Sequence, residues 1–66
     1  MIDARGYLCP TPVMMTKEAL KGRPDTLEVL VDARAAVENI TRFARSQGYS
    51  ITETPEGPDY KLTLKR

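Results

Sequence analysis

The chain has 66 residues and a net charge of +1, so its length allows one domain and its charge gives no sign of a nucleic-acid or membrane partner. Its single cysteine excludes an internal disulfide, and the absence of histidine excludes a cysteine–histidine metal site. With 41% hydrophobic residues, we expect residues 1–66 to form one domain that folds on apolar packing and backbone hydrogen bonds, with no cofactor and no metal.

The first predicted element is a strand over residues 1–5, in which apolar and polar side chains alternate. A connecting turn follows over residues 6–9. Pro10 and Pro12 then mark the first turn of a helix, where a missing backbone N–H is tolerated. This helix is expected to run to about Lys21.

The middle of the chain predicts a second strand and a second helix. Gly22 is expected to end the first helix in the left-handed conformation that often follows a helix C-terminus. Residues 26–31 alternate in hydrophobicity as a strand does, although Leu30 on the polar face needs a partner or a neighbouring loop to explain it. Asp32 is a favoured N-cap residue and predicts a helix over residues 33–47.

The C-terminal third predicts a β-hairpin. Gly48 is suited to cap the second helix, and residues 49–52 and 60–65 alternate as two strands do. Between them, residues 55–59 (Pro-Glu-Gly-Pro-Asp) carry turn chemistry. The order β-α-β-α-β-β predicts an α+β fold, a two-layer α/β sandwich in which two helices cover one face of a mixed four-stranded sheet.

Cys9 lies where the predicted turn meets the predicted helix. Helix N-termini lower cysteine pKa values, because their unpaired N–H groups and the macrodipole stabilise a thiolate. Pro10 and Pro12 remove two of those donors, which weakens the effect, but they also hold the backbone rigidly. Arg5 and Lys17 are near enough in sequence to give the thiolate electrostatic support.

Two interpretations of Cys9 stay open at this point: a small buried hydrophobe, as lone cysteines often are, or an exposed, reactive thiol. Without histidine there is no cysteine–histidine pair for acyl transfer. Without a second cysteine there is no C-x-x-C couple and no internal resolving thiol. The chemistry that remains for a reactive Cys9 is to accept a sulfur atom from one protein and give it to another.

The run Asp3-Ala4-Arg5-Gly6-Tyr7-Leu8-Cys9-Pro10-Thr11-Pro12-Val13-Met14-Met15 closely resembles the signature of the TusA/SirA-like sulfur-carrier family, in which the Asp…Gly…Cys-Pro-x-Pro spacing is specific. The similarity covers nearly the whole chain, continuing through Val31-Asp32, Glu38-Asn39, Arg42-Phe43-Ala44 and Gly48-Tyr49. The middle segment is most similar to the N-terminal domain of the YedF branch, a relative linked to selenium metabolism.

The resemblance implies the same fold and a persulfide on Cys9, received from a donor such as a cysteine desulfurase and passed to an acceptor protein. In one branch of the family the sulfur finally reaches a tRNA wobble uridine. Pro10 and Pro12 match the motif prolines that shape the cysteine loop. Asp3 and Gly6 match motif positions for which we expect a structural role, Asp3 by tying the backbone of the loop and Gly6 by supplying an unusual backbone angle. Such a protein is a sulfurtransferase-like persulfide carrier and not a self-sufficient catalyst.

Two alternatives stay open beside this function: selenium handling of the YedF type by the same cysteine, and a small RNA-binding or regulatory module. The near-neutral charge of the chain counts against the RNA-binding module, because direct binding of nucleic acid usually requires a basic surface. YedF-type proteins often carry a second, C-terminal domain, so a chain ending at Arg66 is either a stand-alone carrier or a domain of a longer protein. No apolar run reaches the length of a membrane span and the N-terminus lacks a signal-peptide pattern, so we expect a cytoplasmic location.

Two groups of side chains could contact partners. Met14 and Met15 follow the cysteine loop, and since adjacent helical residues point about 100° apart, we expect at least one of them to lie outside the main core stripe. Arg34, Arg42 and Arg45 on the second helix are expected to form a solvated face together with Glu38, because mixed-charge helices commonly do.

Overall fold

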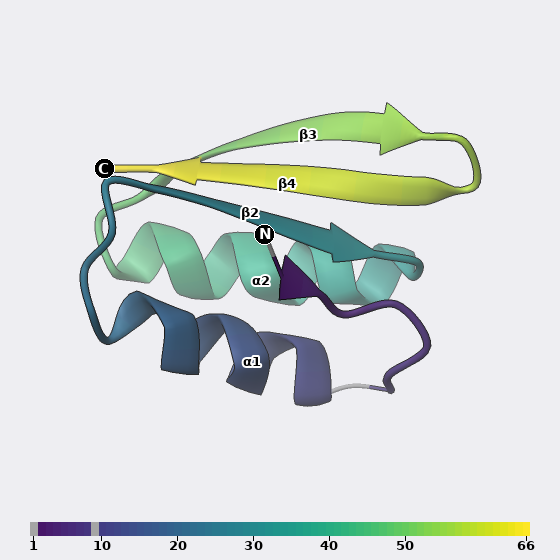
Figure 1. Ribbon diagram of the computed structural model, residues 1–66, viewed down its shortest axis with the longest axis horizontal. Coiled ribbons are helices and arrows are strands. Elements are labelled where there is room, and N and C mark those ends of the chain that lie inside the picture. The colour runs from purple at the N-terminus through teal and green to yellow at the C-terminus, as the bar shows by residue number, and fades with distance from the viewer. Residues whose placement is uncertain (1, 9) are drawn as a thin grey trace.

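The computed structural model describes residues 2–8 and 10–66 (Figure 1), so every expectation about Met1 or Cys9 lies outside the described residues. The elements follow one another as β1 (Ile2–Asp3), α1 (Thr11–Leu20), β2 (Thr26–Val31), α2 (Arg34–Ser46), β3 (Ser50–Glu56) and β4 (Asp59–Lys65). The predicted order β-α-β-α-β-β is confirmed, and the bounds of β2 are those predicted.

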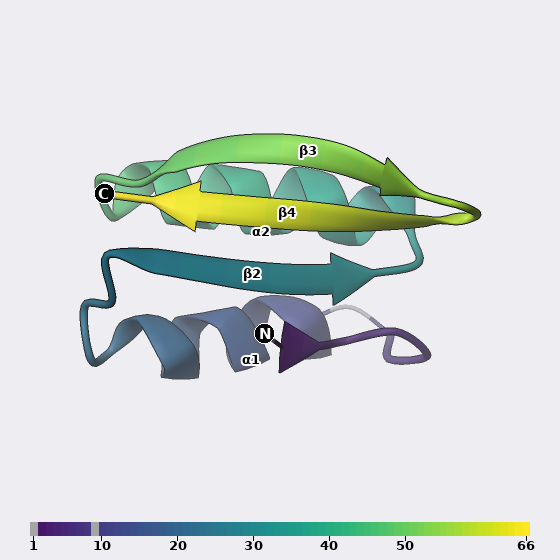
Figure 2. The ribbon, with the colours of Figure 1, turned by 45° about the horizontal axis from the view of Figure 1, so that its top comes forward.

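The four strands form one mixed sheet in the order β1-β2-β4-β3. β1 pairs parallel with β2, while β4 pairs antiparallel with both β2 and β3. Both helices cover the same face of this sheet (Figures 1 and 2), which confirms the predicted two-layer sandwich. Because β1 and β2 are parallel, the loops that follow them leave the sheet at the same end.

The core lies between the helices and the sheet. Val29 on β2 and Leu62 on β4 are cross-strand partners and have no exposed surface, as has Ile40 on α2. Thr16 of α1 is also fully buried, and its hydroxyl donates a 3.0 Å hydrogen bond to the Pro12 carbonyl, which satisfies the buried polar group. The other buried apolar side chains are Ala4, Leu20, Val31, Ala36, Val37, Ala44, Tyr49 and Leu64.

The second face of the sheet carries no helix (Figure 1) and is where Leu30 lies. Leu30 is half-buried there, with Asp3 of β1 as its partner on one side and Lys61 of β4 on the other. Its apolar surface is therefore covered in part by its own cross-strand neighbours, which include the long aliphatic stem of a lysine.

The prediction that Asp32 caps α2 is wrong. The N-cap residue is Ala33, with φ −130° and ψ 136°, and α2 has no side-chain cap hydrogen bond. The Asp32 carboxylate instead accepts a 2.9 Å hydrogen bond from the backbone N–H of Gly6. The physical reason is the parallel pairing of β1 and β2, which places the loop after β1 within reach of the residue that follows β2.

The prediction of a left-handed Gly22 is also wrong, because the positive φ of this turn belongs to Arg23, at 52°. The Arg23 guanidinium lies 5.4 Å from the centre of the Tyr49 ring and donates a 3.2 Å hydrogen bond to the Gln47 carbonyl. These tertiary contacts hold the arginine where a glycine was expected. At the end of α2 the expectation is confirmed, since Gly48 has φ 88° and Tyr49 folds back to donate its backbone N–H to Ala44.

The hairpin turn is shorter than the predicted 55–59. β3 continues to Glu56, which pairs directly with Asp59, so the connection consists of Gly57 and Pro58. Gly57 has φ 62°, as the first position of a two-residue type II′ turn requires. Pro55 is tolerated within β3 because this strand lies at the edge of the sheet.

Candidate functional site

The loop between β1 and α1 contains the cysteine motif and lies at the end of the sheet where both parallel strands finish (Figure 1). On the chain before Cys9, the side chains of Tyr7 and Leu8 are 51% and 85% exposed. Leu8 is thus a large apolar side chain that the fold leaves in solvent. Cys9 itself lies outside the described residues, so its exposure and its pKa remain predictions.

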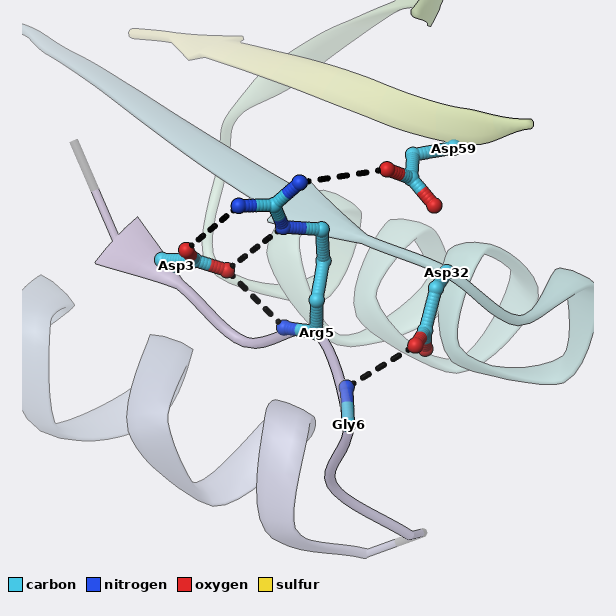
Figure 3. A network of polar contacts seen from close by, with 5 residues as sticks. All are labelled: Asp3, Arg5, Gly6, Asp32 and Asp59. Carbon is cyan, nitrogen blue, oxygen red and sulfur yellow. Dashed lines mark hydrogen bonds and ion pairs between the residues drawn. The ribbon is translucent and has the colours of Figure 1, made fainter. Parts of the chain in front are cut away.

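Three successive backbone N–H groups anchor the start of this loop. Ala4 donates to the Leu30 carbonyl at 2.8 Å. Figure 3 shows the other two contacts, from Arg5 to Asp3 Oδ1 at 3.1 Å and from Gly6 to Asp32 Oδ2 at 2.9 Å. Gly6 has φ 83°, a conformation that glycine adopts without the steric penalty of a Cβ. The contacts of Asp3 and the backbone angle of Gly6 are compatible with the structural roles predicted for them, and those roles stay predictions.

The Arg5 guanidinium is held by two carboxylates. Its Nε and Nη2 donate to Asp3 at 3.0 and 2.9 Å, and its Nη1 donates to Asp59 Oδ2 at 3.3 Å. The side-chain hydrogen bond from Arg5, aided by the Arg5 backbone N–H, lowers the pKa of Asp3 to about 2. The same carboxylates raise the pKa of Arg5 above its ordinary value.

The pairing of Arg5 bears on its expected role. Figure 3 shows its side chain reaching toward Asp3 and Asp59, while the chain continues through Gly6 in another direction. The positive charge of Arg5 is therefore largely compensated by two neighbouring negative charges. Electrostatic support of a Cys9 thiolate by Arg5 stays a prediction, and these two carboxylates compete with it.

The downstream side of the motif is the start of α1. Pro10 is the N-cap residue, with φ −95° and ψ 15°, and Pro12 is the second helical residue and is buried. The Pro10 carbonyl accepts the Met14 N–H at 3.0 Å, and the Thr11 N–H donates to the Leu8 carbonyl at 2.9 Å. The expectation that both prolines belong to the helix start is met, with Pro10 directly before the first helical residue.

Lys17 does not lie at this helix start. It is exposed and belongs to the last turn of α1, about 10 Å along the axis from Pro10 at 1.5 Å per residue. A cation there complements the negative end of the helix dipole. Its expected support of the Cys9 thiolate would therefore act over a long distance and remains a prediction.

An apolar hollow of about 590 Å³ lies on one side of α1. Met14 is 61% exposed, whereas Met15 is half-buried against the core, as expected for adjacent helical residues. The lining residues of this flank hollow are Ile2, Thr11, Met14, Met15, Glu18 and Ala19.

The seam between α1 and α2 forms a second surface, made of two hollows of about 500 and 160 Å³ that share Phe43. Their lining combines apolar side chains with the cations Lys17, Lys21 and Arg42, and it contains no carboxylate. The lining residues of this helix seam are Pro10, Val13, Lys17, Leu20, Lys21, Asn39, Arg42, Phe43, Ser46 and Gln47.

Arg34, Arg42 and Arg45 are exposed and line one open hollow together with Glu38, as expected of a solvated face. This hollow has a volume of about 470 Å³, and Arg42 also borders the helix seam. Arg34 donates to Glu53 at 2.6 Å and lies 5.8 Å from the centre of the Tyr60 ring.

Neither a metal site nor a membrane segment is found in the described part of the chain. Within residues 2–8 and 10–66, no three histidine, cysteine, aspartate or glutamate side chains are grouped as metal ligands. No described helix has the length and apolar character needed to cross a bilayer.

Sequence reasoning missed two residues of the loop anchor, Asp32 and Asp59. Asp32 follows β2 directly, so knowing that β1 and β2 are parallel neighbours would have brought it to the loop. Asp59 is 54 residues from Arg5 in the chain and meets it only because β4 lies next to β2. No pattern in the sequence indicates the contact between Asp59 and Arg5.

The proteins to which this chain is similar are described as sulfurtransferases, sulfur carriers or SirA-like proteins. The family model described as sulfurtransferase TusA matches residues 1–66. A candidate sulfur carrier from Methanocaldococcus jannaschii is 37% identical over 68 residues, covering 98% of this chain and 91% of that protein. The candidate sulfur carrier YedF of Escherichia coli is 29% identical, over 98% of this chain and 88% of YedF. The crystal structure of a SirA-like protein from Desulfitobacterium hafniense superposes with a TM-score of 0.87 at 29% identity, covering 97% of this chain and 92% of that one.

Proposed function

Since the chain belongs to the TusA family of sulfur carriers, we propose that it accepts a sulfur atom on Cys9 as a persulfide and passes it to an acceptor protein. A cysteine desulfurase is the proposed donor. The observation that carries this proposal is the Cys-Pro-x-Pro motif on the loop between β1 and α1, within a family match over residues 1–66. A reducing cytoplasm, where a lone cysteine stays a thiol, is the proposed location.

The proposed chemistry is two successive exchanges at sulfur. The Cys9 thiolate attacks the outer sulfur of the donor's persulfide, an S–S bond forms on Cys9, and the donor cysteine leaves as a thiolate. A thiolate of the acceptor then attacks the outer sulfur now held by Cys9, and the Cys9 thiolate is released. Each step consumes one thiolate and one S–S bond and regenerates both, so no electron carrier is needed.

The exposed side chains around the motif support a relay between proteins. Leu8 and Met14 lie on either side of the motif in sequence and are 85% and 61% exposed, which is unusual for large apolar residues. The helix seam adds Lys17 and Arg42 to an apolar lining without carboxylates. We therefore propose that partners approach along α1 and present apolar and acidic side chains.

The test is intact-protein mass spectrometry after incubation with a cysteine desulfurase and L-cysteine, with Cys9→Ser as the matched control. We expect a gain of one sulfur atom in the wild type, reversed by a reductant and absent from the variant. Thermal melts of the two proteins should agree closely, as the prediction that Cys9 is exposed requires. A wild type that gains no sulfur while Cys9 can still be alkylated would contradict the proposed function.

A further inference from the structure

We propose that Asp32 is a positioning residue for persulfide transfer, fixing the arm of the loop that leads into Cys9 by accepting the Gly6 N–H. The inference rests on the proposed function. It assigns a role in the transfer reaction to a residue that lies outside the Cys-Pro-x-Pro motif and follows a different strand.

The hydrogen bond joins two parallel strand ends. Gly6 follows β1, Asp32 follows β2, and the distance between Gly6 N and Asp32 Oδ2 is 2.9 Å across 26 residues of sequence. Asp32 makes this contact from the position directly before the N-cap of α2, which Ala33 occupies. The cap of α2 is left without a side-chain hydrogen bond, so the carboxylate serves the loop in place of the helix.

Gly6 is the last anchored N–H before the cysteine. Among the described residues, neither Tyr7 nor Leu8 donates its backbone N–H, and the next hydrogen bond is that from Thr11 to the Leu8 carbonyl. Without the Asp32 contact, the upstream arm of the loop would be held only as far as Arg5. Since Gly6 has φ 83° and glycine readily adopts other backbone angles, it would then act as a hinge.

A freed hinge affects sulfur transfer more than it affects the fold. Attack on a persulfide requires the thiolate and the outer sulfur to be aligned within the docked pair of proteins, and orientation of this kind contributes strongly to rate. Asp32 is exposed and belongs to no buried cluster, so its removal leaves the core and the clamp of Arg5 by Asp3 and Asp59 in place.

The experiment compares Asp32→Ala and Asp32→Leu, which cannot accept the bond, with Asp32→Asn, which keeps a side-chain carbonyl. The matched control is Asp25→Ala, which removes an exposed carboxylate just before the other end of β2, where it pairs with Arg66. Three quantities are measured: hydrogen exchange of the Gly6 amide, the initial rate of sulfur loading by a cysteine desulfurase, and the rate of Cys9 alkylation by iodoacetamide.

We expect the Gly6 amide of Asp32→Ala and Asp32→Leu to exchange about tenfold faster than in the wild type, as loss of one hydrogen bond predicts. Sulfur loading should slow by a similar factor, about tenfold, because alignment with the donor is lost. Alkylation by the small reagent should change less than about twofold, because it requires no docked geometry. Asp32→Asn and Asp25→Ala should resemble the wild type in all three measurements.

Several outcomes would overturn the inference. Loading of Asp32→Ala or Asp32→Leu at the wild-type rate would show that the contact does not position Cys9. Failure of Asp32→Asn to rescue loading, or equal slowing by Asp25→Ala, would show that charge and not the hydrogen bond is responsible. A wild type that takes up no sulfur would instead overturn the proposed function, and this inference with it.

Discussion

Asp3 combines a backbone contact and an ion pair within one short segment. Its carboxylate accepts hydrogen bonds from the Arg5 side chain and from the Arg5 N–H, on the residue before the hinge glycine. Loss of the charge on Asp3 would therefore weaken both the clamp on Arg5 and the start of the loop. The lowered pKa of Asp3 makes this contribution dependent on pH.

We predict that part of the stability of the fold is lost as the pH falls from about 4 to about 2. The pKa of Asp3 is lowered to about 2 in the fold, from an ordinary 3.8, chiefly by the hydrogen bond from the Arg5 side chain. A lowered folded-state pKa stabilises the fold above the unfolded value, and this contribution disappears as the pH drops through the folded one. Urea unfolding at a series of pH values should show a shallower decline for Asp3→Asn than for the wild type. Parallel curves for the two proteins would contradict the assignment.

Single residues mark the limit of what could be predicted from sequence. The positive φ of Gly6 and the positions of Pro10 and Pro12 follow from local chemistry, and local chemistry is visible in the sequence. Asp32 and Gly22 could not be placed. The Asp32 carboxylate binds a backbone N–H of another loop, and the contacts of Arg23 with Gln47 and Tyr49 place the positive φ on Arg23. At both positions, tertiary contacts override the local preference of the residue for a helix cap.

At the scale of elements, the helices and strands with strong hydrophobic periodicity were predicted within one or two residues. β2 agrees at both ends and α2 is shorter than predicted by one residue at each end. β3 was predicted too short because Pro55 suggested a turn, although an edge strand accepts a proline. The order of the strands in the sheet could not be predicted from the sequence. The contacts of Asp32 and Asp59 depend on that order, so they could not be predicted either.

The uncapped start of α2 predicts a stabilising substitution. Ala33 has the extended backbone of an N-cap residue but no side chain that can accept a hydrogen bond. Ala33→Ser should therefore raise the free energy of unfolding by about 1 kcal/mol. The measurement is urea unfolding, compared with Ala35→Ser, which places the same side chain on an exposed site within the helix and should lower stability by about 0.5 kcal/mol. A similar effect at both positions would refute a specific capping role.

At the scale of the molecule, a 66-residue fold has little stability to spare. At about 0.05–0.15 kcal/mol per residue, its free energy of unfolding is on the order of 3–10 kcal/mol. Leu8 and Met14 are exposed and add little to this stability, which depends on a small core centred on β2, β4 and α2. Truncation of any large side chain in this core should therefore remove a large share of the free energy of unfolding.

We predict that Leu62→Ala removes much of the total stability, whereas Leu8→Ala removes almost none. Leu62 has no exposed surface and lies on β4, between β2 and β3, so its truncation should cost about 2–5 kcal/mol. Leu8 is 85% exposed, and its truncation should change the free energy of unfolding by less than about 0.5 kcal/mol. Chemical unfolding monitored by circular dichroism distinguishes the two. Comparable losses would mean that Leu8 packs against the fold.

The two edge strands of the sheet, β1 and β3, are poorly suited to pair with a strand of another protein. β1 offers two described residues to a neighbouring strand, and β3 at the opposite edge contains Pro55, which has no N–H, one residue before its end. Short edge strands and prolines discourage a foreign strand from joining a sheet. For the proposed relay, we therefore expect partners to contact side-chain surfaces such as the flank hollow and the helix seam, from which separation breaks no β-ladder. Without backbone pairing to break, we expect such a carrier to dissociate readily from its donor before it binds its acceptor.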